Sequence, residues 1–271
     1  MVWLPRWGCD GMITSAQKLL MARAGVVSEP NYWDVTTASF VQSKSVTPES
    51  RRLNGFFFKP DGLTAWTAQS YNGRVVEYSL STAFDISTMS PTGNIVTSAR
   101  ASFVEFKPDG NVFYSGDPAF GTIRVSTLTV AWDITTASSV NVGGFSGIDG
   151  ARFKPDGTKL YTVTNGNVSE YALSTAWDVS TAGSATTLSP TGTGHSGLFF
   201  KPDGETVYIS ADGTDRIYQY SLSTAWDIST ASLFGSFYTG SNDPQDVLFT
   251  SDGAKMFVSL FAEQINEYDI G

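Results

Sequence analysis

Cysteine and histidine are almost absent from this sequence, which has one of each in 271 residues. The single cysteine, Cys9, excludes an internal disulfide, and the two counts together exclude a zinc site built from Cys and His side chains. No apolar run reaches the length of about 18 residues that a membrane-spanning helix needs. The first residues have no apolar core of signal-peptide length.

Positive charge is also scarce. The chain has 17 Lys and Arg residues against 26 Asp and Glu residues, which gives a formal net charge of −9. Nucleic-acid binding needs concentrated Lys and Arg, and anionic membrane surfaces attract basic segments. The composition therefore argues against a nucleic-acid partner and against membrane insertion.

Repetition is what the sequence has in abundance. The segment FKPDG stands at 58–62, 106–110, 153–157 and 200–204, and a degraded copy, FTSDG, stands at 249–253. A second segment keeps the same spacing of about 48 residues, as in YSLSTAWDIST from Tyr220, and a partial copy, YWDVTTAS, occupies 32–39. Repeats of this length determine the architecture.

Each repeat reads as four short strands. In residues 197–237, GLFF, ETVYISA, RIYQYSLS and ASLFGSFY are separated by turn residues. Pro202 cannot donate to a sheet, and Asp203 with Gly204 favours a tight turn. No repeat shows helical spacing of apolar residues. The pattern predicts one blade of a β-propeller per repeat.

The last repeat ends after its third strand, at Gly271, and the missing strand stands near the N-terminus, around 39–46. We expect this segment to form the outer strand of the last blade, which leaves no open seam in the ring. The prediction is an all-β, five-bladed propeller over residues 31–271, preceded by an extended or helical N-terminal arm over residues 1–30.

The pattern FKPDG…VYIS…RIYQYSL resembles the repeats of the WD-repeat and YVTN-like propeller superfamily. The resemblance implies the fold and not an activity, because propellers host many unrelated functions. The Trp-Asp pair departs from the WD-repeat pattern, since here it follows LSTA in the connection after the third strand. No functional residue of that superfamily is therefore transferred to this chain.

Residues that recur in every repeat are expected to serve the fold. We expect the aspartates of the DG turns to be structural and the aspartate after each repeated aromatic to cap its turn through nearby Ser or Thr amides. The repeated aromatics are expected to fill the gaps between blades, with sugar-stacking platforms as the alternative. They are Trp33, Phe84, Trp132, Trp177 and Trp226.

A ligand site is expected where the repeats differ, at the entry to each inner strand near the mouth of the central channel. The polar residues there are Arg52, Asn54, Arg100, Ser102, Asp149, His195, Ser196, Asp243, Gln245 and Asp246. The longest loop at this end, SGDPAFGT, adds Phe120. GHSG around His195 lacks the G-x-S-x-G nucleophile motif, so no catalytic residue is assigned, and neither a metal nor a cofactor is expected. ADGTD at 211–215 reads as a structural turn rather than a calcium loop.

Residues 1–30 belong to no repeat. They hold Trp3, Trp7 and a basic apolar segment with Lys18, Leu19, Leu20 and Arg23. Apolar and Arg side chains of this kind tend to carry interfaces, so we expect the arm to contact another chain, with a disordered tail as the alternative. SAQKLLMARAG ahead of LSTAWDISTA repeats is similar to virion proteins of tailed phages, including those of marine bacteria. The resemblance implies a multi-copy virion component, assembled in the host cytoplasm and held to other virion proteins by the arm.

The sequence favours a non-enzymatic virion protein that displays its propeller for adhesion or decoration, with a host-surface glycan as its candidate ligand. The alternatives are a free carbohydrate-binding lectin and a hydrolase or lactonase-like propeller. A lectin should repeat one polar pocket in each blade, which the differing ring residues do not favour. An enzyme should place several carboxylates or a metal in the channel, and Asp149, Asp243 and Asp246 are the candidates.

Overall fold

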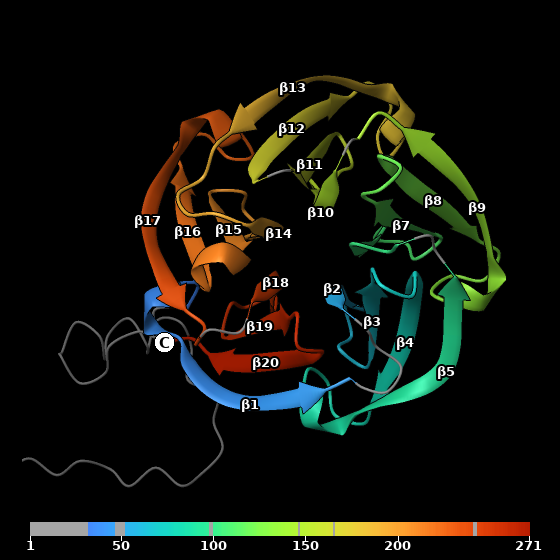
Figure 1. The fold of residues 1–271 in the computed structure, drawn as a ribbon, viewed down its shortest axis with the longest axis horizontal. Coiled ribbons are helices and arrows are strands. Elements are labelled where there is room, and N and C mark those ends of the chain that lie inside the picture. Colours follow the sequence, from blue (N-terminus) through green and yellow to red (C-terminus); the bar gives the residue numbers. More distant parts are fainter. Residues whose placement is uncertain (1–31, 47–51, 98–99, 146, 165, 241–242) are drawn as a thin grey trace, which may run out of the picture. The chain divides into compact units, whose positions relative to one another are not determined.

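The computed structural model describes residues 32–46, 52–97, 100–145, 147–164, 166–240 and 243–271. In these segments the strands form five antiparallel four-stranded sheets arranged as the blades of a ring (Figure 1). The predicted all-β, five-bladed propeller is confirmed. No helix among the described residues has the length and apolar character that crossing a membrane requires. The predicted arm, residues 1–30, lies outside the described residues.

Four blades are built from strands that follow one another along the chain. Blade 1 comprises β2 (Leu53–Phe58), β3 (Thr64–Gln69), β4 (Arg74–Leu80) and β5 (Met89–Thr97). Blade 2 comprises β6 (Val104–Phe106), β7 (Val112–Asp117), β8 (Thr122–Leu128) and β9 (Ala137–Gly143). Blade 3 comprises β10 (Ile148–Phe153), β11 (Lys159–Thr164), β12 (Asn167–Leu173) and β13 (Ala182–Leu188). Blade 4 comprises β14 (His195–Phe200), β15 (Thr206–Ala211), β16 (Arg216–Leu222) and β17 (Ala231–Tyr238).

The fifth blade joins the two ends of the propeller. Its three inner strands are β18 (Pro244–Phe249), β19 (Lys255–Leu260) and β20 (Gln264–Asp269). The outer strand is β1 (Ser39–Ser45), which pairs antiparallel with β20 and lies beside it in Figure 1. The predicted closure is confirmed, and it covers the edge that β20 would otherwise expose.

The two repeated segments of each blade form one structural module. In blade 4 the Pro-Asp-Gly turn ends at Gly204, whose φ of 76° favours glycine. The backbone N–H of Trp226 donates to the Gly204 carbonyl at 2.9 Å, and the indole ring lies so close that a Cβ on Gly204 would overlap it. The same glycine–aromatic pairing recurs in the other blades, which explains why the two segments recur together.

The repeated aromatic rings lie between neighbouring blades, as predicted. The Trp132 ring of blade 2 stacks against Trp66 of blade 1, with centroids 5.8 Å apart, and against Phe106 at 5.2 Å. Trp33, which precedes the outer strand of blade 5, stacks on Phe199 of blade 4 at 6.3 Å. Because aromatic side chains bury large areas, these rings join separate sheets into one core.

The predicted aspartate caps are also present. Asp227 Oδ1 accepts the backbone N–H of Ser229 at 3.0 Å, and Asp203 Oδ1 in the DG turn accepts that of Glu205 at 2.9 Å. Equivalent caps begin the one-turn 3₁₀ helices η1 (Val35–Thr37), η2 (Ile86–Thr88), η3 (Ile134–Thr136), η4 (Val179–Thr181) and η6 (Ile228–Thr230). A further 3₁₀ turn, η5 (Asp212–Thr214), lies between β15 and β16.

The inner strands approach one another closely around the channel. A Cβ on Gly197 of β14 would lie 2.7 Å from Asp246 Cα on β18, and one on Gly150 of β10 would overlap the Ser196 carbonyl. Glycine at these positions lets neighbouring backbones meet without a side chain between them. The inner strands of blades 3, 4 and 5 are therefore in close contact below the mouth of the channel.

Candidate functional site: a charged pocket at the channel mouth

A pocket of about 470 Å³ lies at the end of the channel where the inner strands begin. Its volume is within the range of small-molecule sites. Six of the polar residues that the sequence predicts for this ring line it together: Arg52, Asn54, Arg100, Ser102, Asp149 and Gln245. The structure therefore brings six of the predicted residues together in one pocket, whose other lining residues are Ser70, Tyr71, Pro118, Asp212 and Phe261.

The residue directly before β2, β10, β14 and β18 has a positive φ, and so has Arg100, four residues before β6. These residues stand six positions before the phenylalanine of each turn motif, and their φ values are 59° at Arg52, 61° at Arg100, 68° at Gly147, 68° at Gly194 and 46° at Asp243. Glycine adopts this backbone without strain, whereas a residue with a side chain is strained there. Three blades keep a charged residue at a position suited to glycine, and strain of this kind gathers at functional sites.

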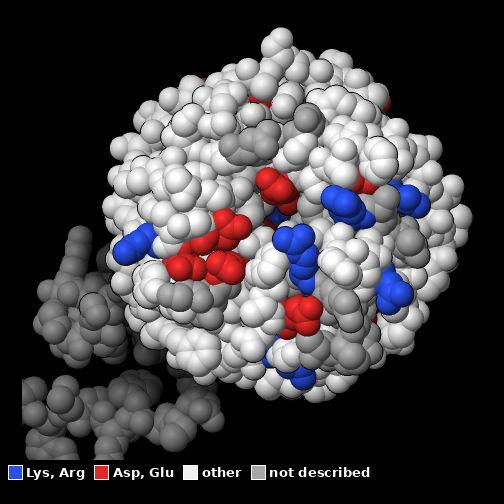
Figure 2. Space-filling view, in the orientation of Figure 1, with Lys and Arg blue, Asp and Glu red and all other residues white. Residues whose placement is uncertain are grey.

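The pocket is basic on one side and acidic on the other. Arg52 and Arg100 come from blades 1 and 2, and neither forms an ion pair within the described segments. Asp149 and Asp212 come from blades 3 and 4. Figure 2 shows acidic side chains gathered on one side of the centre of this face and basic ones on the other. A ligand entering the pocket meets opposite charges on its two sides.

Asp149 has an unusual protonation equilibrium. Burial raises the pKa of Asp149 to about 6, and the negative charge of Asp212 raises it further in the same direction. Burial also raises the pKa of Asp212, against a hydrogen bond from Gln245. A carboxylate whose pKa lies this near neutrality can both accept and release a proton under physiological conditions.

Gln245 connects the two sides of the pocket. Its Oε1 accepts from Asn54 Nδ2 at 3.2 Å, and its Nε2 donates to Asp212 Oδ2 at 3.3 Å and to the Asp243 carbonyl at 3.2 Å. Asn54 Oδ1 is buried and has no hydrogen-bond partner among the described residues. This bridge fixes the floor of the pocket and leaves one acceptor atom available.

An aromatic rim adjoins the basic side. The Arg52 guanidinium lies over the Phe261 ring, with Cζ 4.6 Å from the ring centroid. Tyr71, from the loop between β3 and β4, lines the same pocket and is 65% exposed. Neither Tyr71 nor Phe261 is among the predicted site residues, although both stand in the loops that join second and third strands.

Several predicted ring residues do not line the pocket. His195 is buried in the wall of blade 4, with Nδ1 2.7 Å from the Gly166 carbonyl oxygen and Nε2 3.0 Å from that of Thr191. Asp243 stands at the rim, where its carbonyl accepts from the Phe261 N–H at 3.1 Å. Phe120 is exposed but does not line the pocket, and Ser196 and Asp246 are buried. The register shifts near the start of β14, between His195 and Gly197, and near the start of β18, between Pro244 and Asp246.

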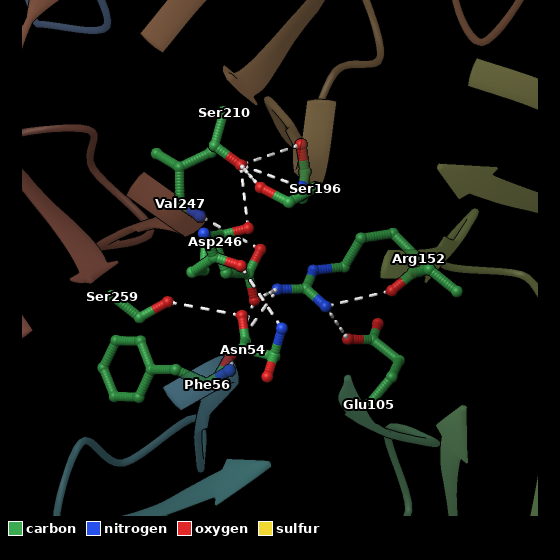
Figure 3. A network of polar contacts seen from close by, with 12 residues as sticks. Asn54, Phe56, Glu105, Arg152, Ser196, Ser210, Asp246, Val247 and Ser259 are labelled. Carbon is green, nitrogen blue, oxygen red and sulfur yellow. Dashed lines mark hydrogen bonds and ion pairs between the residues drawn. The ribbon is translucent and has the colours of Figure 1, made fainter. Parts of the chain in front are cut away.

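Asp246 belongs to a buried ionic cluster deeper in the channel (Figure 3). Arg152 Nη2 donates to Asp246 Oδ2 at 2.7 Å, and Arg152 Nη1 lies 3.5 Å from Glu105 Oε2. Asp246 Oδ2 also accepts the Phe56 N–H at 3.2 Å, and Oδ1 accepts that of Val247 at 3.0 Å. The cluster ties together the inner strands of blades 1, 2, 3 and 5 beneath the pocket.

The buried cluster predicts a pH-dependent stability. Burial raises the pKa of Glu105 to about 7, although the positive charge of Arg152 opposes this. Between pH 4.5 and about pH 7, Glu105 is ionised in the unfolded chain but still protonated in the folded chain. The free energy of unfolding should therefore fall as the pH rises through this range. At about 1.4 kcal/mol per pKa unit, the fall due to Glu105 is about 3 kcal/mol.

A Glu105→Gln variant isolates this contribution, because other carboxyl groups titrate equally in both proteins. Urea unfolding at several pH values from 4 to 8 should give a wild-type-minus-variant difference that declines through pH 4.5–7 and is flat on either side. A difference that stays constant over the whole range contradicts the assignment to Glu105.

No group of three or more His, Cys, Asp or Glu side chains in the described segments is placed to hold a metal ion.

Comparison with known proteins places the chain among β-propellers. Residues 72–264, more than half of the chain, match the family model described as "Lactonase, 7-bladed beta-propeller". The crystal structure of a protein from Lactobacillus plantarum has a TM-score of 0.48 and 16% identity, over 76% of this chain and 63% of that one. The chain thus spans less than two thirds of that protein. No curated protein matches the chain.

The family match corrects one expectation from the sequence. The prediction that this protein is not an enzyme is wrong, because the matching model is that of an enzyme family. The model specifies seven blades, whereas the ring described here closes with five. The partners, the virion location and the glycan ligand stay predictions.

Proposed function

The chain belongs to the lactonase family of β-propellers, and we propose that it hydrolyses a lactone or a related ester at the channel-mouth pocket. The observation that carries this proposal is Asp149. It is a half-buried carboxylate with a pKa of about 6, and it shares the pocket with two guanidiniums that have no ion-pair partner in the described segments. These are a base and a source of positive charge, which are the two requirements of ester hydrolysis.

Asp149 acts as the general base. In its ionised form it takes a proton from a water molecule while the water oxygen forms a bond to the carbonyl carbon. The carbonyl oxygen gains negative charge in the resulting tetrahedral intermediate. When the intermediate collapses, the bond from carbon to the ring oxygen breaks, and Asp149 returns its proton to the departing alkoxide. The product is a hydroxy acid, and Asp149 is again ionised.

Arg52 and Arg100 stabilise the negative charge that develops on the carbonyl oxygen. Both have a positive φ in the segment that leads into an inner strand, and both line the pocket. Fixed positive charges aimed at a developing oxyanion are often the largest single contribution to catalysis. After hydrolysis, the same guanidiniums face the product carboxylate.

The proposal is tested with a panel of lactones and esters, with acid release followed in weakly buffered solution. We expect the wild type to hydrolyse at least one ring size, and an Arg52→Gln/Arg100→Gln variant to lose about 30-fold in kcat. This is less than the 10²–10³ for a buried oxyanion donor, because both guanidiniums are exposed to water.

The matched control removes two cations from the same blades at the opposite end of the channel. Lys59 and Lys107 pair with aspartates of the turn motifs, so a Lys59→Gln/Lys107→Gln variant should keep full activity. Absence of hydrolysis across the panel, or equal loss in both double variants, overturns the proposal.

A further inference from the structure

We propose that the acyl part of the substrate is an aromatic ring, so that hydrolysis in this pocket yields an aromatic carboxylate. The inference rests on the proposed function and names the substrate class of that same site. It is carried by the rings of Phe261 and Tyr71, which line the pocket and come from blades 5 and 1. A third ring, Phe120, is exposed on the blade 2 loop whose Pro118 lines the same pocket.

Arg52 and Phe261 form the centre of this arrangement. The guanidinium lies over the ring, with Cζ 4.6 Å from the ring centroid. A guanidinium held on an aromatic face keeps its N–H groups at its edge, where they can bind a carboxylate in two-point fashion. A planar ring attached to that carboxylate then extends over the neighbouring aromatic surface.

The loop of blade 2 presents an aromatic ring to solvent in a fixed geometry. Phe120 is 78% exposed, yet its turn is ordered by Asp117, a buried side chain whose Oδ1 accepts the N–H groups of Ala119 at 3.1 Å and Phe120 at 3.3 Å. Asp117 thus stabilises a turn that leaves a large apolar side chain in water. Pro118 of the same turn lines the pocket, so this loop borders the pocket and carries an exposed aromatic ring, which fits a role in ligand contact.

The acidic side of the pocket lacks such aromatic rings among the described residues. The corresponding loops of blades 3 and 4 contribute Asn167 and the turn at Asp212–Asp215, with no aromatic ring among their described residues. Asp149 and Asp212 repel a carboxylate. The charges and the aromatic rings therefore favour the same orientation of the bound product, in which its carboxylate and its aromatic ring both lie on the basic side of the pocket.

A sugar acid is the rival ligand class for this side of the pocket. Two polar groups here are already engaged, because Ser102 Oγ donates to the Ile148 carbonyl at 2.8 Å and Asn54 Nδ2 donates to Gln245 Oε1 at 3.2 Å. Among the other lining residues, Arg52 and Arg100 present guanidinium groups and Tyr71 and Phe261 present aromatic rings.

The test measures binding without turnover, so it is independent of whether a lactone is hydrolysed. The full chain is titrated by calorimetry with phenylacetate, cyclohexylacetate, phenylacetamide and gluconate. We expect phenylacetate to bind at least about tenfold more tightly than each of the others. Equal affinity for cyclohexylacetate or gluconate overturns the aromatic assignment, and equal affinity for phenylacetamide overturns the role of the guanidiniums.

Single substitutions test which residues provide the preference for an aromatic ligand. Tyr71→Leu and Phe261→Leu keep apolar volume but remove the ring, and each should weaken phenylacetate binding about fivefold to tenfold while leaving cyclohexylacetate binding unchanged. Phe234→Leu is the matched control, since Phe234 is an exposed ring on the outer strand of blade 4. Unchanged phenylacetate binding in both pocket variants contradicts the proposal.

Discussion

An Arg152→Met variant should unfold with a free energy about 3–5 kcal/mol lower than the wild type, because removing one partner of a buried ionic cluster leaves uncompensated charge. Arg152 is buried and lies between Asp246 and Glu105 on the inner strands of two other blades. Methionine has a similar length and no charge. Urea unfolding followed by tryptophan fluorescence measures the difference.

Two further variants test the reason for this loss. Lys201→Met breaks an exposed ion pair with Asp203 and should cost less than about 1 kcal/mol, as exposed pairs do. A triple variant with Arg152→Met, Glu105→Gln and Asp246→Asn has no unpaired charge, and it should regain more than half of the lost stability. If Arg152→Met costs no more than Lys201→Met, the cluster does not stabilise the ring.

The fold was predictable because its determinants repeat. The glycine of each turn and the aromatic residue after LSTA contact each other within the blade, so both had to recur together. A pattern that occurs five times is far more informative than any single strand prediction. The closing strand could be predicted by counting strands. The last repeat has only three strands, and the N-terminal segment 39–46 has the sequence of the missing fourth, so this segment had to complete the blade.

The site was only partly predictable because it consists of what does not repeat. Asp212 belongs to ADGTD, whose sequence is that of an ordinary turn, and its neighbour across the pocket, Asp149, comes from a different blade. Nothing in the sequence shows that the negative charge of Asp212 raises the pKa of Asp149. Arg152 is a comparable case. A charged residue within an apolar strand indicates a buried ion pair, but its partners, Glu105 on blade 2 and Asp246 on blade 5, can be identified only from the closed ring.

An Asp149→Asn variant should lose 10²–10⁴-fold in kcat on any substrate that the wild type hydrolyses, the range expected for loss of a general base. The reason is that asparagine cannot take the proton from water. The change keeps the size of the side chain, so KM should move little. The matched control is Asp156→Asn in the same blade, because Asp156 caps the turn motif at the far end of the channel and should leave kcat unchanged.

The pH profile distinguishes a base from a residue that only shapes the pocket. Because Asp149 is active when ionised and its pKa is about 6, kcat/KM of the wild type should rise with pH and level off above that value. An Asp212→Asn variant removes the neighbouring negative charge that raises this pKa, so the rising limb should move to lower pH. A limb that stays in place in Asp212→Asn, or persists in the residual activity of Asp149→Asn, assigns the titration to another group and removes Asp149 from the mechanism.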